Sequence, residues 1–560
     1  MPAVVAVDAV DYRHVAATTD APITFFDSRG PIEELPRAAA VADARAVAAG
    51  LAHHRLDRHD RVVLLLPTGS DYYGALLGCL LAGVAPCTVA TPATPHDAAS
   101  AGVRHLHAAV AAVRPAAVIV GDARLADAVP AGVPALTVAE LRAHGTVATA
   151  DLGVAGPQDV HHVQLTSGST SSPKAVVLTH ANVAANLAAL DASTRATEPD
   201  EALFTWLPLY HDMGLVQVLF TLTRGVRLDL MSPLAFVRDP LSWLRHMSAR
   251  RSTLTAAPPF AYRAAADRYT ARPDPSIDLS ALRQAYVGAE PIPVDVLTRF
   301  RDTFEVRGLA DEVLVPCYGM AETVLATALA TECRPRTGTS FGRVRWRRFD
   351  RVSLDEHRVA APAVPGRPAR SIVSCGVATA GLTVRICDET GAELAEGQVG
   401  AVRVMGSSVM AGYLTDGGLD APPEGWHDTG DLGVRYDGQL YIVGRTKEML
   451  IVRGRNLPPY DIEDVIEQHP DAHAAAVFSH PADGKATEPV VAVVETRAPE
   501  ADRPDLRAAI STRVREVFGV SLSDVVFVGR GGIPRTSSGK RRRAPLRNDY
   551  LAGRLSCGTG

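Results

Sequence analysis

The segment from Leu165 to His180, LTSGSTSSPKAVVLTH, combines the residue types that bind a phosphate group. Seven of the nine residues from Thr166 to Lys174 are small or hydroxylated. Small residues let backbone N–H groups approach an anion, hydroxyl groups add donors, and the lysine supplies a positive charge. The segment differs from the loop of P-loop NTPases because Gly168 is its single glycine. A serine- and threonine-rich surface loop is the alternative if the segment is taken alone.

Two further segments, CYGMAE (Cys317–Glu322) and VGAEP (Val287–Pro291), have the composition expected around a purine and a metal ion. Tyr318 offers an aromatic face, and Glu322 offers a hard oxygen ligand for Mg²⁺. Small residues beside a predicted strand let a flat base approach closely. Taken singly, the two segments are equally explained as a helix start and an ordinary strand-to-helix connection. The other residues of this candidate site are Gly288, Ala289, Glu290, Gly319 and Met320.

Two segments nearer the carboxyl end carry charged groups in turns. TGDLG presents Asp431, whose carboxylate is suited to accepting both hydroxyls of a ribose. PRTSSGKRRR places Lys540 directly after a Ser-Ser-Gly turn. A structural aspartate and a solvated basic run are the alternatives for the two segments.

The composition is that of a globular enzyme, with 560 residues, 47% of them hydrophobic and 21% charged, and a net charge of −5. Basic runs are confined to Trp346–Arg351 and Lys540–Arg543, so we expect no nucleic-acid partner. The seven cysteines are odd in number and lack zinc-ligand spacing, which favours a reducing compartment and a cytoplasmic location. The first residues lack the basic and apolar regions of a signal peptide. The uncharged stretch Tyr73–Ala90 contains Pro86 and three glycines, which favours a buried helix and strand over a membrane span.

The pattern along the chain predicts an α/β fold. Helical patterns alternate with short apolar runs up to about residue 380, as in buried parallel sheets. Glycine-punctuated alternation from Leu382 onward predicts antiparallel hairpins, and an α+β unit follows Arg445. We therefore expect a large, multi-subdomain N-terminal α/β domain with a small β-barrel-like part (residues 1–444). A hinge (445–447) and a small, mobile α+β C-terminal domain (448–555) would follow. The aperiodic, proline-containing stretch Arg351–Ser371 is predicted to be an insertion or a long loop.

Together these segments resemble the superfamily of adenylate-forming enzymes over roughly residues 20 to 550. The resemblance rests on the phosphate segment and on GAEP, YGMAE, HDTGD, VGRTKEMLIVRGRN and SSGKRRR. It implies that ATP and a carboxylic acid give acyl-AMP and pyrophosphate, and that a thiol then takes the acyl group.

The resemblance also implies roles for individual residues. Lys540 corresponds to the lysine that bridges the carboxylate and the phosphate during adenylation, and Asp431 would hold the ribose. Arg445 would contact the ribose or the phosphates, and Lys447 would be the hinge of domain rotation. Glu322 would hold Mg²⁺, which together with the phosphate segment neutralises the pyrophosphate. The residues of that segment assigned to the nucleotide are Thr166, Ser167, Gly168, Ser169, Thr170 and Lys174.

Within the superfamily the chain is most similar to fatty acyl-AMP ligases. TWLPLYHDMGLV and VRGRNLPPYDIE resemble segments of those enzymes, and an irregular stretch lies where they carry an insertion. Such an insertion is thought to disfavour coenzyme A and to direct the acyl group to an acyl carrier protein. His211 would border the acyl pocket and take part in catalysis, or be a packed core residue, and Met213 and Phe260 would line the same pocket. Lys174, Ala175 and Pro259 depart from the pattern of the ligases.

We therefore expect an enzyme that activates a fatty acid with ATP and Mg²⁺ and delivers it to an acyl carrier protein supplied in trans. An acyl-CoA or aryl-CoA synthetase is the alternative, and a non-catalytic relative that binds nucleotide or acyl chains is a third hypothesis. Arg541–Arg543, or the arginines near residues 343–351, could steer an acidic carrier protein.

Overall fold

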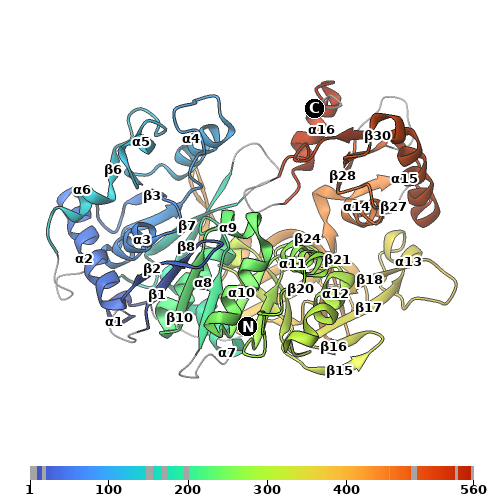
Figure 1. Ribbon diagram of the computed structural model, residues 1–560, viewed down its shortest axis with the longest axis horizontal. Coiled ribbons are helices and arrows are strands. Elements are labelled where there is room, and N and C mark those ends of the chain that lie inside the picture. Colours follow the sequence, from blue (N-terminus) through green and yellow to red (C-terminus); the bar gives the residue numbers. More distant parts are fainter. Residues whose placement is uncertain are drawn as a thin grey trace. The chain divides into compact units, whose positions relative to one another are not determined.

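The computed structural model describes residues 9–15, 21–146, 155–166, 173–194, 201–452, 455–480, 488–535 and 540–555 (Figure 1). The chain forms two compact units, and each contains segments distant in sequence. The first unit comprises residues 1–345, 375–384 and 404–427. The second comprises residues 346–374, 385–403 and 428–560.

The largest sheet belongs to the first unit and has a parallel centre. Its central strands are rich in Val, Leu and Ala and are largely buried on both faces, which is typical of a parallel sheet covered by helices, whereas the edge strand at residues 31–35 is exposed. The neighbours β1, β10, β9, β11, β12 and β13 pair in parallel, so their carboxyl ends lie at one edge. The strand order is β19 (Val377–Ala378), β14 (Ala326–Leu329), β13 (Leu314–Gly319), β12 (Gln284–Val287), β11 (Leu254–Ala257), β9 (Ala202–Thr205), β10 (Arg227–Met231), β1 (Ile23–Phe26) and β2 (Pro31–Leu35).

Two four-stranded sheets also belong to the first unit. One is parallel, with the order β4 (Ala85–Thr88), β3 (Arg61–Leu65), β5 (Ala117–Val120) and β6 (Ala135–Thr137). The other is antiparallel, with the order β23 (Gly418–Asp420), β22 (Gly412–Thr415), β8 (Lys174–Thr179) and β7 (Val160–Thr166). The antiparallel sheet matters for the site because the phosphate segment connects β7 to β8.

Helices flank these sheets, and Figure 1 shows α2 and α3 beside the sheet that contains β3. The two helices approach closely, because a Cβ atom on Gly78 would lie 2.6 Å from the Val47 side chain. The helices of the first unit are α1 (Tyr12–Val15), α2 (Arg37–His53), α3 (Ser70–Ala82), α4 (Ala101–Val113), α5 (Ala123–Ala126), α6 (Val138–Arg142), α7 (His180–Thr194), α8 (Asp212–Arg224), α9 (Pro233–Arg238), α10 (Pro240–Arg250), α11 (Pro259–Ala271) and α12 (Val294–Phe304).

The second unit combines hairpins with an α+β part. Three strands, β28 (Ala474–Ser479), β29 (Val490–Glu495) and β30 (Leu522–Val528), form a sheet whose Val-rich strands are buried. Its helices are α13 (Arg351–Asp355), α14 (Pro459–Glu467), α15 (Arg503–Phe518) and α16 (Arg543–Leu551). Two of the remaining strands, β15 (Arg334–Thr337) and β16 (Ser340–Gly342), lie in the first unit. The others are β17 (Val344–Asp350), β18 (Ala369–Val373), β20 (Leu382–Cys387), β21 (Val399–Gly406), β24 (His427–Tyr436), β25 (Gln439–Arg445), β26 (Leu450–Val452) and β27 (Arg455–Leu457).

The α/β fold is confirmed, and so are the buried helix and strand in Tyr73–Ala90. Among the described residues no helix is long and apolar enough to cross a membrane. The stretch Arg351–Ser371 is not an unstructured loop throughout, because it begins as α13 and ends in β18. The strand orders of the antiparallel sheets leave free edges, so no closed barrel forms in the described part of the chain. The boundary at residue 444 and the hinge remain predictions.

Candidate functional site

The residues assigned to the site from sequence fall into two groups, one in each compact unit. The first unit carries the phosphate segment, the residues after β12 and β13, and the candidate acyl-pocket residues. The second unit carries Asp431, Arg445, Lys447 and Lys540. Ser167, Gly168, Ser169 and Thr170 lie outside the described residues, whereas the flanking Thr166 and Lys174 face each other across β7 and β8.

The carboxyl edge of the large sheet brings GAEP and YGMAE together. Val287 ends β12 beside Pro316 of β13, so the residues that follow each strand are neighbours. A Cβ atom on Gly288 would lie 2.6 Å from Cys317 Sγ and 2.8 Å from the Cys317 carbonyl oxygen, so this approach requires glycine. The next residue, Ala289, is exposed and has φ of +68°. A ligand at the carboxyl ends of parallel strands is the usual arrangement in α/β folds.

Glu322 lies in a short 3₁₀ turn, Ala321–Thr323, that is followed by a strained residue. Val324 has φ of +69° and ψ of −59°, and the Leu325 N–H donates a hydrogen bond to the Thr323 carbonyl oxygen at 2.9 Å. These values define a γ-turn in the conformation that is rare for a β-branched residue and that costs about 1–3 kcal/mol. Strain of this kind persists where surrounding contacts fix the backbone.

Tyr413 connects Glu322 with Lys174. The Tyr413 hydroxyl donates a hydrogen bond to Glu322 Oε1 at 2.7 Å. Lys174 Nζ lies 4.4 Å from the centroid of the Tyr413 ring, which is the geometry of a cation–π contact. The pairing of β22 with β8 produces this arrangement, because Leu414 of β22 lies opposite Ala175 of β8. The sequence prediction missed Tyr413, since a lone aromatic residue in MAGYLT carries no signal of its partners.

Glu322 fits Mg²⁺ as a single carboxylate ligand. In nucleotide sites this ion is held by one or two carboxylates, with the remaining positions taken by phosphate oxygens and water. One oxygen of Glu322 accepts the Tyr413 hydroxyl, which orients the carboxylate without replacing its charge. Among the described residues there is no group of three or more His, Cys, Asp or Glu side chains that could hold a metal. Substrate phosphates would therefore have to supply further ligands.

The candidate acyl-pocket residues follow the ends of β9 and β11. His211 is half-buried and precedes α8, and Met213 is buried in its first turn. Phe260 is the second residue of α11 and is 37% exposed, and its ring meets that of Trp206 edge-on at a centroid distance of 6.1 Å. Trp206 itself stacks on Phe236 at 3.7 Å, so aromatic rings cover the carboxyl ends of β9 and β10. The roles of His211, Met213 and Phe260 remain predictions.

Asp431 and Arg445 are brought together in the second unit. They lie opposite each other in the β24–β25 pair, and Arg445 Nε donates to Asp431 Oδ1 at 3.0 Å. Gly430, which precedes Asp431 in β24, has φ of +72°, a conformation that favours glycine. The Asp431 side chain is 7% exposed, whereas the Arg445 side chain is 57% exposed. The carboxylate is thereby fixed while the guanidinium remains accessible to a ligand.

Lys540 directly precedes Arg541, which forms an isolated antiparallel bridge with Arg535. Residues 536–539 lie outside the described residues. Lys447 is exposed in the 3₁₀ turn Thr446–Glu448. Arg541 and Arg543 form ion pairs with Glu463 and are largely buried, which does not favour a steering role for these two side chains, whereas Arg542 is exposed. Steering of a carrier protein by Arg542, or by the arginines near residues 343–351, remains a prediction.

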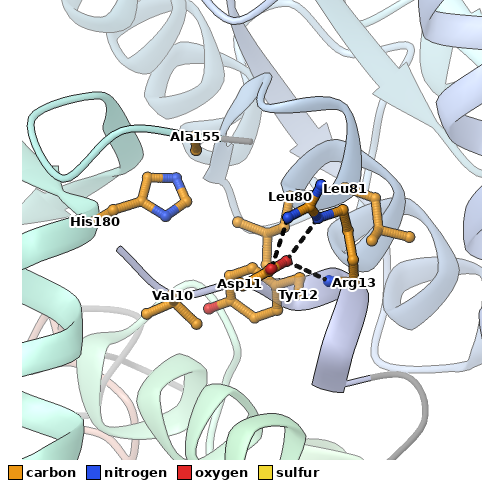
Figure 2. A pocket seen from close by; sticks show the side chains of 8 residues that line it. All are labelled: Val10, Asp11, Tyr12, Arg13, Leu80, Leu81, Ala155 and His180. Carbon is orange, nitrogen blue, oxygen red and sulfur yellow. Dashed lines mark hydrogen bonds and ion pairs between the residues drawn. The ribbon is translucent and has the colours of Figure 1, made fainter. Parts of the chain in front are cut away.

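Figure 2 shows a small pocket in the first unit that none of the sequence-predicted residues lines. Its wall includes Tyr12 and His180, and both side chains belong to a buried histidine cluster. The Tyr12 hydroxyl hydrogen-bonds to His161 Nε2 at 2.7 Å, and Nδ1 of His161 lies 2.8 Å from Nδ1 of His162. Burial and the neighbouring His180 lower the pKa of His162 to about 3. The cluster is therefore neutral at pH 7.

We expect the neutral histidine cluster to make the first unit sensitive to acid. The unfolded chain takes up a proton on His162 near pH 6.5, whereas the folded chain does so only near pH 3. Stability is therefore complete above pH 6.5 and falls as the pH drops toward 3, by about 2 kcal/mol at pH 5 from this residue. Urea unfolding at pH 7 and pH 5 should show a smaller decline for His162→Asn than for the wild type. The exposed His59→Asn serves as the control, and parallel declines in all three proteins would contradict the assignment.

Comparison with known proteins adds independent evidence. The profile of the AMP-binding enzyme family matches residues 13–414, and that of the AMP domain of Disco-interacting protein 2-like proteins matches residues 447–559. A putative acyl-CoA synthetase of Caulobacter vibrioides is 32% identical, and the alignment covers 96% of this chain and 94% of that protein. JamA of Moorena producens, a medium-chain-fatty-acid–[acyl-carrier-protein] ligase, is 32% identical, and the alignment covers 91% of this chain and 89% of JamA. A structure from a study of fatty acyl-adenylate ligases of E. coli and L. pneumophila is similar with a TM-score of 0.87 at 33% identity, covering 98% of both chains.

Proposed function

The chain belongs to the AMP-binding family of adenylate-forming enzymes, and from this premise we propose that it converts a fatty acid and ATP into fatty acyl-AMP and pyrophosphate, then transfers the acyl group to an acyl carrier protein. The cluster of Glu322, Tyr413 and Lys174 carries the proposal. It joins an oriented carboxylate for Mg²⁺ to a lysine at the end of the phosphate segment. Since ATP and a carrier thiol are the co-substrates, we place the reaction in the cytoplasm.

The proposed chemistry assigns separate tasks to these side chains. The acid's carboxylate oxygen attacks the α-phosphorus, and the bond to pyrophosphate breaks, so negative charge grows on the phosphate oxygens. Lys174 and the N–H groups of the phosphate segment stabilise the leaving pyrophosphate, and Glu322 would hold the Mg²⁺ that neutralises it further. Asp431 orients the ribose through its carboxylate, which Arg445 holds in place. Lys540 supplies positive charge where the carboxylate meets the phosphate.

The contacts of residues 346–374 support a carrier protein as the acceptor. These residues belong to the same compact unit as residues 428–560. Arg370 lies 2.9 Å from Asp461, and Arg455 lies 3.2 Å from Glu356, so ion pairs join the stretch to β27 and α14. An insertion tied to the carboxyl-terminal part in this way restricts the conformations that this part samples. The restriction is our reason for favouring a carrier protein over coenzyme A.

An acyl-CoA synthetase is the second candidate, because the relative from Caulobacter vibrioides bears that name. Both candidates are tested by one experiment on the purified protein. Pyrophosphate exchange with a panel of medium-chain, long-chain and aryl acids reports adenylation, and no exchange with any acid would refute the proposed function. Acyl-AMP formed with the best acid is then offered to coenzyme A or to a phosphopantetheinylated carrier protein. Thioester formed only with the carrier supports the first candidate, and thioester formed only with coenzyme A supports the second.

Removing the hydroxyl that orients Glu322 should weaken adenylation. Tyr413→Phe keeps the ring beneath Lys174 but leaves Glu322 Oε1 without its 2.7 Å donor. A hydrogen bond to a charged group is worth about 1.5–3 kcal/mol, so we expect a fall of about tenfold or more in exchange rate and a higher Mg²⁺ requirement. Titration of exchange rate against Mg²⁺ measures both. Tyr436→Phe, in the second unit, is the matched control, and equal Mg²⁺ requirements for both variants would contradict this role of Tyr413.

A further inference from the structure

The three arginines after Lys540 do not form a solvated basic run. Arg541 and Arg543 point inward, with side chains 19% and 17% exposed, whereas Arg542 between them is exposed. Arg542 caps α16 and Arg543 is its first residue, so the three arginines lie where the chain enters this helix. Both inward-pointing arginines contact the carboxylate of Glu463, and the Glu463 side chain is fully buried, with 0% exposure.

Glu463 on α14 binds both arginines and the backbone of β28. Arg543 forms a bidentate pair with it, donating from Nε to Oε1 at 2.7 Å and from Nη2 to Oε2 at 2.6 Å. Arg541 spans Glu463 and Glu467, at 2.5 Å to each. The Val477 N–H donates to Glu463 Oε1 at 2.8 Å. Burial by itself raises the pKa of Glu463, but Arg543 and Arg541 outweigh it and lower the pKa to about 2.

The same cluster reaches the turn that contains the predicted hinge. Arg543 Nη1 donates to Glu448 Oε2 at 2.7 Å, and Glu448 directly follows Lys447. One arginine therefore ties both the segment after Lys540 and the turn at residues 446–448 to the buried Glu463. We name the set Arg541, Arg543, Glu448, Glu463 and Glu467 the arginine clamp.

We propose that the arginine clamp positions Lys540 for the adenylation step and fixes it relative to the turn at Lys447. The proposal rests on the proposed function. Consecutive Cα atoms are 3.8 Å apart, so fixing Arg541 leaves the backbone of Lys540 little freedom. The ammonium group of a flexible lysine side chain stabilises a transition state only when the backbone of the lysine is held in place. Misplacement by about 1 Å costs about a hundredfold in rate. Arg541 and Arg543 are positioning residues, because they touch Glu463 rather than the substrate.

Arg541→Gln tests the positioning role with little risk to folding, because Glu463 keeps its bidentate partner Arg543. We expect the maximal rate of pyrophosphate exchange to fall about tenfold to a hundredfold, with the KM for ATP changed by no more than about twofold. Transfer of the acyl group from preformed acyl-AMP should stay within about twofold of the wild type, since that step does not use Lys540. Arg541→Lys retains the charge but not the fork that spans two carboxylates, so its exchange rate should lie in between.

Arg542→Gln is the matched control, because its exposed side chain lies outside the clamp. Its exchange rate should equal that of the wild type. Thermal unfolding of each variant separates positioning from loss of folded protein. An Arg541→Gln protein with wild-type exchange would overturn the proposal, and so would one in which exchange and transfer fall in the same proportion. A wild-type protein that shows no exchange with any acid would refute the proposed function, and the clamp's role would fall with it.

Discussion

Lys540→Ala should nearly abolish formation of acyl-AMP while leaving acyl transfer largely intact. Adenylation builds negative charge between the carboxylate and the α-phosphate, and the Lys540 ammonium group is the cation assigned to that position. Loss of one preorganised donor of this kind lowers the rate by about 10²–10³-fold, or about 3–4 kcal/mol of transition-state stabilisation. Transfer to a thiol needs no cation at the phosphate of ATP, so it should change little. Pyrophosphate exchange measures the first step, and thioester formation from synthetic acyl-AMP measures the second.

Two variants sharpen the Lys540 experiment. Lys540→Arg keeps a positive charge but replaces a compact ammonium group with a planar fork, so it should recover only part of the lost rate. Arg542→Ala removes an exposed cation two residues away and should leave the adenylation step unchanged. If Lys540→Ala lost both steps equally while remaining folded, the assignment of Lys540 to adenylation would be wrong.

Glu322→Gln should cause the second large loss of adenylation activity, because the variant should bind Mg²⁺ more weakly. The amide keeps the shape of the side chain and can still accept the Tyr413 hydroxyl, so the turn around Val324 should be preserved. The negative charge that holds the metal disappears, however, and charge stabilisation by a bound metal is worth several kcal/mol in phosphoryl transfer. We expect exchange to fall by about a hundredfold, with the rate no longer saturating in the Mg²⁺ range of the wild type.

A binding measurement makes the Glu322 result independent of turnover. Calorimetric titration with ATP should show affinity that rises with Mg²⁺ for the wild type and that responds much less to Mg²⁺ for Glu322→Gln. Glu332→Gln, at an exposed position in an ion pair with Arg334, is the control and should behave like the wild type. An unchanged Mg²⁺ dependence of ATP binding in Glu322→Gln would show that the metal is held elsewhere.

The sequence alone determined the family and the α/β class, and it predicted which residues contact the nucleotide. It could do so because those signals are local: the phosphate segment spans nine residues, and Glu322 lies five residues after Cys317. Apolar runs such as Ala117–Val120 also predict buried strands directly, because a strand buried on both faces is apolar throughout.

The tertiary structure decided what surrounds those residues. Tyr413 reaches Glu322 from 91 residues away, because β22 pairs with β8, and pairing between distant strands leaves no pattern in one sequence. In the sequence, Arg541 and Arg543 have the composition of a solvated basic run, because a charged residue type does not reveal whether its side chain is exposed. The structure shows that both form ion pairs with the buried Glu463. Val324 is a valine in a conformation that local propensity disfavours, and only the packing around it overrides that preference. Functional groups that lie within a few residues of one another can be predicted from the sequence. The orientation of each group is set by contacts that form only on folding.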